Sequence, residues 1–306
     1  PAHPDERLRE EAKPPRDVFY RKPLRMSRHN WTTTALRAAI LAIVTAWTIF
    51  PIYYMVTLAL TPWNDLFRPV YVVHHPTLDN FKFVLLQESP FVKYFWRWLG
   101  NSLLVSTAVM LAVLAVAALG SYALARIRFG LGRYVSGMTL FTYIIPASFL
   151  SIPFFKIMGD YDLLDTYWAL IFAMTTFAAP YALWVLWDYA KTIPNEIDES
   201  AAIDGAGPVA IFFRMYLPLI TPTLIAVGTY AFFFAWNEYL YAVLLLQGEK
   251  MVTLPVGMGN FLTSDDSPWN LLMALSVIYS IPPVIFYYIF RRYLTHGLVS
   301  GAVQGT

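Results

Sequence analysis

Long apolar stretches alternate with short polar segments along most of the chain. Six of the apolar stretches cover residues 36–60, 99–125, 134–158, 168–190, 218–246 and 270–290. Because an α-helix rises about 1.5 Å per residue, each stretch can cross a hydrocarbon core of about 30 Å. The pattern predicts an all-α, polytopic membrane protein with six transmembrane helices.

Prolines inside these stretches predict kinks or breaks in the helices. Proline removes one backbone hydrogen bond and crowds the preceding turn, which a membrane helix tolerates where neighbours satisfy the freed carbonyl groups. The prolines concerned are Pro51, Pro146, Pro153, Pro180, Pro282 and Pro283. Runs of small residues at 112–120 and 178–179 favour close helix packing. The organisation expected is a polar tail at 1–35, a membrane domain at 36–290 and a second tail at 291–306.

Composition agrees with a membrane protein. Hydrophobic residues make up 58% of the chain and charged residues 14%, with a mean hydropathy of +0.50, whereas soluble domains carry about 25% charged residues. The chain has no cysteine, which excludes disulfides and thiolate chemistry. The pair His74-His75 lacks further ligand spacing, so no metal site is predicted. No basic stripe indicates nucleic-acid binding.

Lysine and arginine predict the orientation in the membrane. With the amino terminus inside, sixteen of the 22 Lys and Arg residues fall in cytoplasmic segments. Cytoplasmic segments of membrane proteins carry an excess of these residues. Both termini are therefore expected in the cytoplasm, together with the polar segment at 191–217. The segments at 61–97 and 247–269 are then outside; their aromatic and turn residues indicate ordered structure.

Residues 194–222 are the longest ordered-looking segment between two apolar stretches. Pro194 begins a predicted short helix, and the acids at 196–199 suit its first turn, where the helix dipole favours negative charge. Gly205 permits a bend, and Pro208 can start a second short helix. Leu217-Pro218 is expected to turn the chain into the next apolar stretch. On these grounds alone, a plain surface loop is an equal alternative.

The same segment resembles a known family. Glu199-Ser200-Ala201, then Gly205, then Met215-Tyr216-Leu217-Pro218 is similar to the "EAA…G…I-x-LP" loop of the permease subunits of bacterial binding-protein-dependent ABC importers. Ser200 and Met215 depart from the Ala and Ile of that motif. In the family this cytoplasmic coupling-helix loop lies in a groove of the ATPase. The resemblance implies the type I ABC importer permease architecture. It also implies ATPase contacts for Glu199, Ser200, Ala201, Asp204, Gly205, Met215, Leu217 and Pro218.

Further motifs resemble the carbohydrate branch, the maltose and multiple-sugar type. These are NSLLVS at 101–106, SYALARIRFGLGR at 121–133, FFFAWNEYLYAVLLL at 232–246 and GLVSGAVQG at 297–305. The last resembles a tail that reaches between the two ATPase subunits, which would place Gly297, Gly301 and Gly305 there; a frayed tail is the alternative.

The resemblance implies a multi-pass subunit of the bacterial inner membrane that moves a carbohydrate. Its expected partners are a second homologous permease in a heterodimer, a dimeric cytoplasmic ABC ATPase, an extracytoplasmic sugar-binding protein and the lipid bilayer. This chain would hold no cofactor, since ATP and Mg would bind the partner ATPase, and no G-x-x-x-x-G-K-[ST] motif occurs here. The outer segments would receive the binding protein, or would only cover helix ends.

One acid falls deep inside a predicted span. Glu238 stands in the run Trp236-Asn237-Glu238-Tyr239, and an acid within a membrane indicates function because an unpaired charge there is costly. The four residues are a possible substrate pathway. A polar clasp between helices is the favoured alternative.

Other classes of function fit less well. An ion-coupled secondary transporter typically carries several midplane ionisable groups and two repeated halves, and neither is evident here. A membrane enzyme needs a catalytic cluster, which is absent from the sequence. An ABC permease for a non-sugar solute, such as a glycerophospho-compound, remains an alternative for the substrate.

Overall fold

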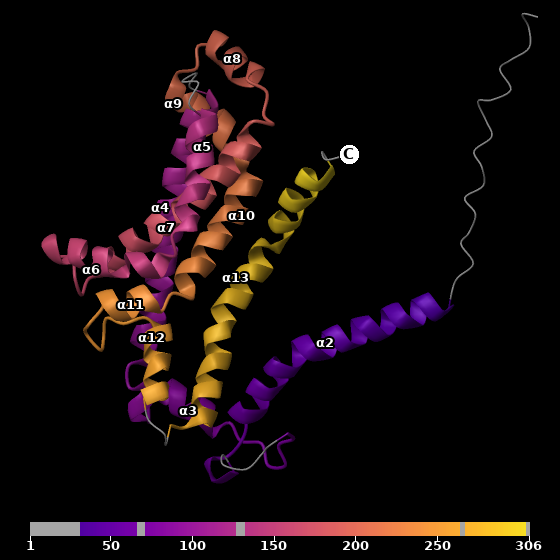
Figure 1. The fold of residues 1–306 in the computed structure, drawn as a ribbon, viewed down its shortest axis with the longest axis vertical. Coiled ribbons are helices and arrows are strands. Elements are labelled where there is room, and N and C mark those ends of the chain that lie inside the picture. Colours follow the sequence, from indigo (N-terminus) through magenta and orange to yellow (C-terminus); the bar gives the residue numbers. More distant parts are fainter. Residues whose placement is uncertain (1–30, 66–70, 127–131, 264–266, 304–306) are drawn as a thin grey trace, which may run out of the picture. The chain divides into compact units, whose positions relative to one another are not determined.

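The computed structural model describes residues 31–65, 71–126, 132–263 and 267–303. Within these ranges every regular element is a helix (Figure 1). Their order is α2 (Trp31–Ala59), η1 (Trp63–Asp65), α3 (Asp79–Leu86), η2 (Pro90–Val92), α4 (Phe95–Arg126), α5 (Gly132–Phe141), η3 (Thr142–Ile144), η4 (Ala147–Leu150), α6 (Ser151–Asp160), α7 (Tyr167–Ala190), α8 (Glu196–Ile203), α9 (Pro208–Ile211), η5 (Phe212–Tyr216), α10 (Leu217–Trp236), α11 (Leu240–Leu245), α12 (Leu254–Gly259), η6 (Asn260–Thr263) and α13 (Trp269–Val303). The predicted all-α class is confirmed.

Five described helical segments are long and apolar enough to cross a membrane, at residues 31–59, 90–126, 167–190, 208–236 and 269–292. The predicted span at 134–158 is bent instead: the helical pieces 137–144 and 147–160 meet at 81°. The break falls at Pro146, whose predicted disruption of the helix is confirmed. Counting the bent pair as one span gives the six that the sequence predicts.

The predicted span at 218–246 is likewise not one helix. Helix α10 ends at Trp236, and α11 begins at Leu240 after a three-residue break. The N–H of Asn237 still donates to Phe233, four residues earlier, but the N–H of Glu238 donates to Ala235, only three residues earlier, and the helical pattern ends there. The continuous apolar character of the sequence hid this break.

The core lies where α4, α7 and α10 pack against one another, with α13 against α10. One face of α7 carries fully buried alanines, at Ala169, Ala173, Ala178 and Ala182. A methyl group built on Gly120 of α4 would lie 2.8 Å from a methyl of Leu183 on α7. Small residues thus permit the close approach of α4 and α7, as their spacing predicts.

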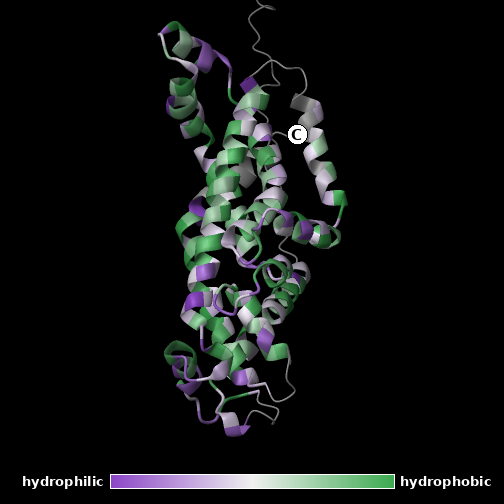
Figure 2. Cartoon of the chain, turned by 90° about the vertical axis from the view of Figure 1, so that its left-hand side faces the viewer, coloured by the Kyte–Doolittle hydropathy of each residue, from purple (hydrophilic) through white to green (hydrophobic). Residues whose placement is uncertain are grey.

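The two ends of α4 carry different polar structures. In Figure 2 hydrophilic residues gather on the α8 hairpin and in the loops near α3, while hydrophobic residues dominate the helices between them. The 32 residues of α4 give a length of about 48 Å at 1.5 Å per residue. The fold therefore separates two candidate sites by about the thickness of a membrane.

Candidate coupling hairpin and outer cavity

The segment at 194–217 forms a hairpin of two short helices. Helix α8 ends in a Schellman motif, in which the N–H of Ala206 donates to the carbonyl of Ala201 at 2.9 Å and the N–H of Gly205 donates to Ala202 at 3.0 Å. Gly205 has a φ of 87°, in the left-handed region that favours glycine. The predicted glycine elbow is therefore present, and it closes α8 by satisfying its last carbonyl groups.

The exit from the hairpin differs from the prediction. Leu217-Pro218 does not turn the chain; α9 continues through the π-helical turn η5 directly into α10. The N–H of Leu217 donates to the carbonyl of Phe212, five residues earlier. Proline has no N–H to donate and crowds the preceding turn, and the wider π-turn relieves both constraints.

The residues of the predicted ATPase-coupling set all lie on this hairpin or at its exit. Ala201 is buried, whereas Glu199, Ser200, Asp204, Gly205, Met215 and Pro218 are exposed and Leu217 is half-buried. Two apolar side chains that the motif does not include, Ile203 and Val209, are 86% and 70% exposed. The hairpin therefore exposes apolar side chains together with carboxylates.

Arg126 holds the hairpin against the helix bundle, a role that sequence reasoning missed. Its Nε lies 2.6 Å from Asp198 Oδ2 of α8. Its Nη1 donates to the carbonyl of Ile193 at 3.2 Å and to Oδ1 of Asn195. The sequence alone identifies Asp198 only as an acid suited to the first turn of a helix. The arginine that ends the apolar stretch 99–125 was the available signal.

Tyr216 anchors the exit of the hairpin. It is fully buried, and its hydroxyl donates to Ser121 Oγ of α4 at 2.9 Å. Its ring packs edge-on to Tyr122 at 4.9 Å and lies 5.8 Å from the Arg126 guanidinium.

The residues of the possible substrate pathway do not converge. Trp236 is buried, stacked on Tyr279 of α13 with ring centroids 5.2 Å apart. The Tyr279 hydroxyl donates to the Trp236 carbonyl at 2.9 Å and to Asn237 Oδ1 at 3.2 Å. This is a polar clasp between α10 and α13. A pathway role for these residues stays a prediction.

Glu238 lies in the break between α10 and α11 and not within a helix. Its Oε1 accepts a hydrogen bond from the N–H of Tyr241 at 2.7 Å, which caps the first turn of α11. Tyr239 is 46% exposed. The acid that looked unpaired in an apolar stretch therefore satisfies a helix terminus.

The carboxyl-terminal tail is helical for longer than expected. Helix α13 runs past residue 290 to Val303, so Gly297 and Gly301 lie within it. Gly305 falls outside the described residues, as does the tail at 1–30. Contact of these glycines with an ATPase stays a prediction.

At the other end of α4, hydrogen bonds order the segment at 247–254. The indole N–H of Trp98 donates to the carbonyl of Glu249 at 2.7 Å. Asn101 Nδ2 donates to the carbonyls of Lys250 and Val252 at 2.9 and 2.8 Å. These contacts confirm the order that the residue mixture of 247–269 predicts, within its described part.

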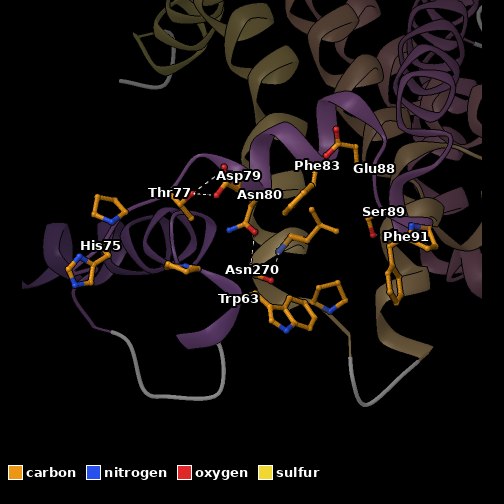
Figure 3. A pocket seen from close by; sticks show the side chains of 15 residues that line it. Trp63, His75, Thr77, Asp79, Asn80, Phe83, Glu88, Ser89, Phe91 and Asn270 are labelled. Atoms are coloured by element: carbon orange, nitrogen blue, oxygen red, sulfur yellow. Dashed lines mark hydrogen bonds between the residues drawn. The ribbon is translucent and has the colours of Figure 1, made fainter.

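A cavity of about 810 Å³ lies beside the start of α13 (Figure 3). Its floor is an amide pair in which Asn270 Nδ2 donates to Asn80 Oδ1 at 3.0 Å. Asn80 Nδ2 in turn donates to the carbonyls of Ala59 and Thr61. The wall carries aromatic, hydroxyl and carboxylate side chains, namely Trp63, His75, Thr77, Asp79, Phe83, Glu88, Ser89 and Phe91.

Together these features define a membrane-embedded subunit with a polar helical hairpin at one end and an open cavity at the other. Residues 116–299 match the family of binding-protein-dependent transport system inner membrane components. The chain belongs to this family. It is therefore a permease subunit of an ABC importer, a transport component and not an enzyme.

Relatives and a solved structure agree with this family. The chain is 39% identical to the inner membrane ABC transporter permease protein YcjP of Escherichia coli, over 71% of this chain and 76% of the relative. It is 31% identical to the arabinooligosaccharides transport system permease protein AraQ of Halalkalibacterium halodurans, over 84% and 91%. A crystal structure of a bacterial ABC transporter that imports the acidic polysaccharide alginate matches with a TM-score of 0.75, 23% identity and coverage of 87% and 98%.

Proposed function

We propose that this chain is the translocation subunit of an importer that takes up a carbohydrate. It would pair with a homologous permease and with a dimeric cytoplasmic ATPase that binds ATP and Mg, while an outer binding protein delivers the sugar. The single observation that carries the ATPase role is the hairpin at 194–217. The names of relatives, such as the arabinooligosaccharide permease, support a carbohydrate as the substrate class.

In this mechanism the ATPase groove receives the exposed face of the hairpin. Ile203 and Val209 provide apolar contact, and the carboxylates of Glu199 and Asp204 face basic groups of the groove. When ATP closes the two ATPase subunits, the hairpin moves with them. Because α9, η5 and α10 are continuous, that movement reaches the membrane helices and alternates access to the sugar.

The opposite end of α4 would then face outward. This orientation, with both termini in the cytoplasm, is supported by the excess of Lys and Arg in the sequence segments predicted to be cytoplasmic. The cavity between Trp63 and Phe91 (Figure 3) lies at that outer end. It is suited to receive part of the binding protein, because its aromatic and polar groups are those enriched at protein interfaces.

The test is purification of the tagged chain from its native membrane in mild detergent, followed by mass spectrometry and reconstitution. A second permease, an ATPase with a Walker motif and a binding protein are expected to co-purify. Vesicles containing the complex should take up the sugar held by that binding protein only with internal ATP. Uptake by the chain alone without ATP would contradict the proposal, and a non-sugar ligand would contradict its substrate class.

A further inference from the structure

Arg126, the last residue of α4, contacts the segment that leads into the coupling hairpin. Its guanidinium pairs with Asp198, and it also donates to Ile193 and Asn195, so three points of that segment converge on one side chain. The side chains of Arg126 and Asp198 are only 9% and 14% exposed. Little water surrounds the pair, so salt screens it only weakly.

The preceding turn of α4 holds the segment that leaves the hairpin. Tyr216 of η5 donates to Ser121 at 2.9 Å, and Tyr122 packs edge-on to the rings of Phe212 and Tyr216 at 5.2 and 4.9 Å. The Arg126 guanidinium lies 5.8 Å from the Tyr216 ring, within the range of a cation–π interaction. The last two turns of α4 thus contact both the segment that enters the hairpin and the segment that leaves it.

The far end of the same helix holds the outer segment at 249–252. Trp98 and Asn101 donate three hydrogen bonds of 2.7 to 2.9 Å to its backbone carbonyls. Between these two attachment points α4 is one uninterrupted helix with a buried face on α7 and α10. A continuous packed helix can transmit a displacement along its axis.

We propose that Arg126 is a positioning residue that fixes the coupling hairpin to α4 through Asp198. Displacement of the hairpin by the ATPase then moves α4 as a rod, and the outer segment at 249–252 moves with it. This proposal rests on the proposed function. Arg126 would thus provide a second path, besides the continuous chain from the hairpin into α10, by which movement of the hairpin reaches the membrane helices.

A second ion pair near the hairpin provides a matched control. Lys191 Nζ lies 2.6 Å from Asp188 Oδ1, the same distance as in the Arg126–Asp198 pair. Its side chains, however, are 48% and 58% exposed; Asp188 lies in the last turn of α7 and Lys191 is the residue that follows the helix. Exposed pairs of this kind contribute little, so Lys191→Gln removes a cation without detaching the hairpin.

The experiment uses the complete importer in proteoliposomes with its binding protein. Three quantities are measured: co-purified ATPase, the ATPase rate without binding protein, and sugar molecules taken up per ATP hydrolysed. Arg126→Gln and Asp198→Asn are each expected to lower uptake per ATP about tenfold, in the range by which single residues alter coupling. Co-purified ATPase and the unstimulated rate should stay unchanged, and Arg126→Lys should recover part of the loss.

A double mutant separates coupling from general damage. If the two residues act through one another, Arg126→Gln with Asp198→Asn should lose no more coupling than either single variant. Additive losses, a normal ratio in Arg126→Gln, an equal loss in Lys191→Gln, or loss of the ATPase from the Arg126→Gln complex would each overturn the proposal. If the wild-type complex showed no ATP-driven uptake, the proposed function itself would be contradicted. The results with the variants test only the role of Arg126.

Discussion

The N–H of Ala206 donates to the carbonyl of Ala201 at 2.9 Å and thereby closes α8 of the coupling hairpin. The closure requires Gly205, the residue just before Ala206, to adopt a φ of 87°. An added side chain there would meet no atom of this chain within 4 Å. Backbone conformation, and not space within this chain, therefore selects glycine at the elbow.

Substitutions at Gly205 should follow backbone preference. Asn visits positive φ more readily than other residues, so Gly205→Asn should keep most of the coupled transport. Gly205→Pro should abolish it, because proline fixes φ near −65° and removes the N–H that donates to Ala202. Uptake per ATP in the reconstituted importer measures both. Equal activity of the two variants would contradict the role of the elbow.

A bulky substitution at Gly205 distinguishes the backbone role of this residue from contact with the ATPase. A Cβ atom at position 205 would meet nothing of this chain within 4 Å, and the positive φ strains Gly205→Ala and Gly205→Trp alike. Damage by Trp beyond that by Ala would therefore arise at the surface that we propose the ATPase covers. We expect Gly205→Trp to uncouple ATP hydrolysis from transport while the protein remains folded in the membrane. Retained transport would argue against docking at this face.

Close packing of α12 against α4, at the end of α4 away from the hairpin, gives a test of the fold. A methyl group on Gly257 of α12 would lie 2.7 Å from the Cδ2 and Cζ3 atoms of Trp98. Since the Trp98 indole is held by Glu249, it cannot move without losing that hydrogen bond. Gly257→Ala should lower stability by about 1–3 kcal/mol, as overpacking does, measured as a lower midpoint of thermal unfolding in detergent.

Gly100 of α4 is the matched control, because a methyl group there meets nothing within 4 Å. Gly100→Ala should leave the midpoint unchanged or raise it, since alanine favours a helix by about 1 kcal/mol over glycine. Similar midpoints for the two alanine variants would show that the contact of Gly257 with Trp98 is wrong.

Low pH should weaken the hydrogen bonds that Asp79 accepts beside the cavity. Asp79 accepts hydrogen bonds from Thr77 at 2.6 Å and Lys82 at 3.3 Å, and these lower the pKa of its carboxyl group. A lowered pKa in the folded state stabilises the fold above the unfolded value, near 3.9, and the contribution is lost as pH falls through the folded value. Because the Asp79 side chain is 57% exposed, solvent weakens these interactions and the contribution should be small.

The difference in unfolding midpoint between wild type and Asp79→Asn should therefore be constant from neutral pH to about pH 5 and should shrink below about pH 4. Asp162→Asn, a change of an aspartate in a turn outside the cavity, controls for general charge effects. A difference that grows on acidification would have the wrong sign and would contradict the assigned hydrogen bonds.

The sequence predicts the helices well because long apolar stretches leave few alternatives in a membrane. It also predicts the bend at Gly205, because a glycine that follows a short helix commonly ends that helix, and this preference depends only on neighbouring residues. It does not predict the break before α11, because the apolar composition of 218–246 is the same on both sides. Nor does it predict the pairing of Arg126 with Asp198, residues 72 positions apart, or the capping of α11 by Glu238. The ion pair depends on how α4 and α8 pack in three dimensions, and the capping by Glu238 depends on where the backbone leaves the helical conformation.

The cavity leads to a prediction about the binding protein. Trp63 is 52% exposed at its mouth, and tryptophan is enriched among residues that dominate binding energy at protein interfaces. Trp63→Ala should raise about tenfold or more the concentration of binding protein that half-maximally stimulates the ATPase. The unstimulated ATPase rate should not change, since the hairpin is at the other end of α4. Tyr134→Ala, which removes an aromatic side chain that is 70% exposed on α5, should leave the stimulation normal. Normal stimulation of the Trp63→Ala complex would exclude the cavity from the docking surface.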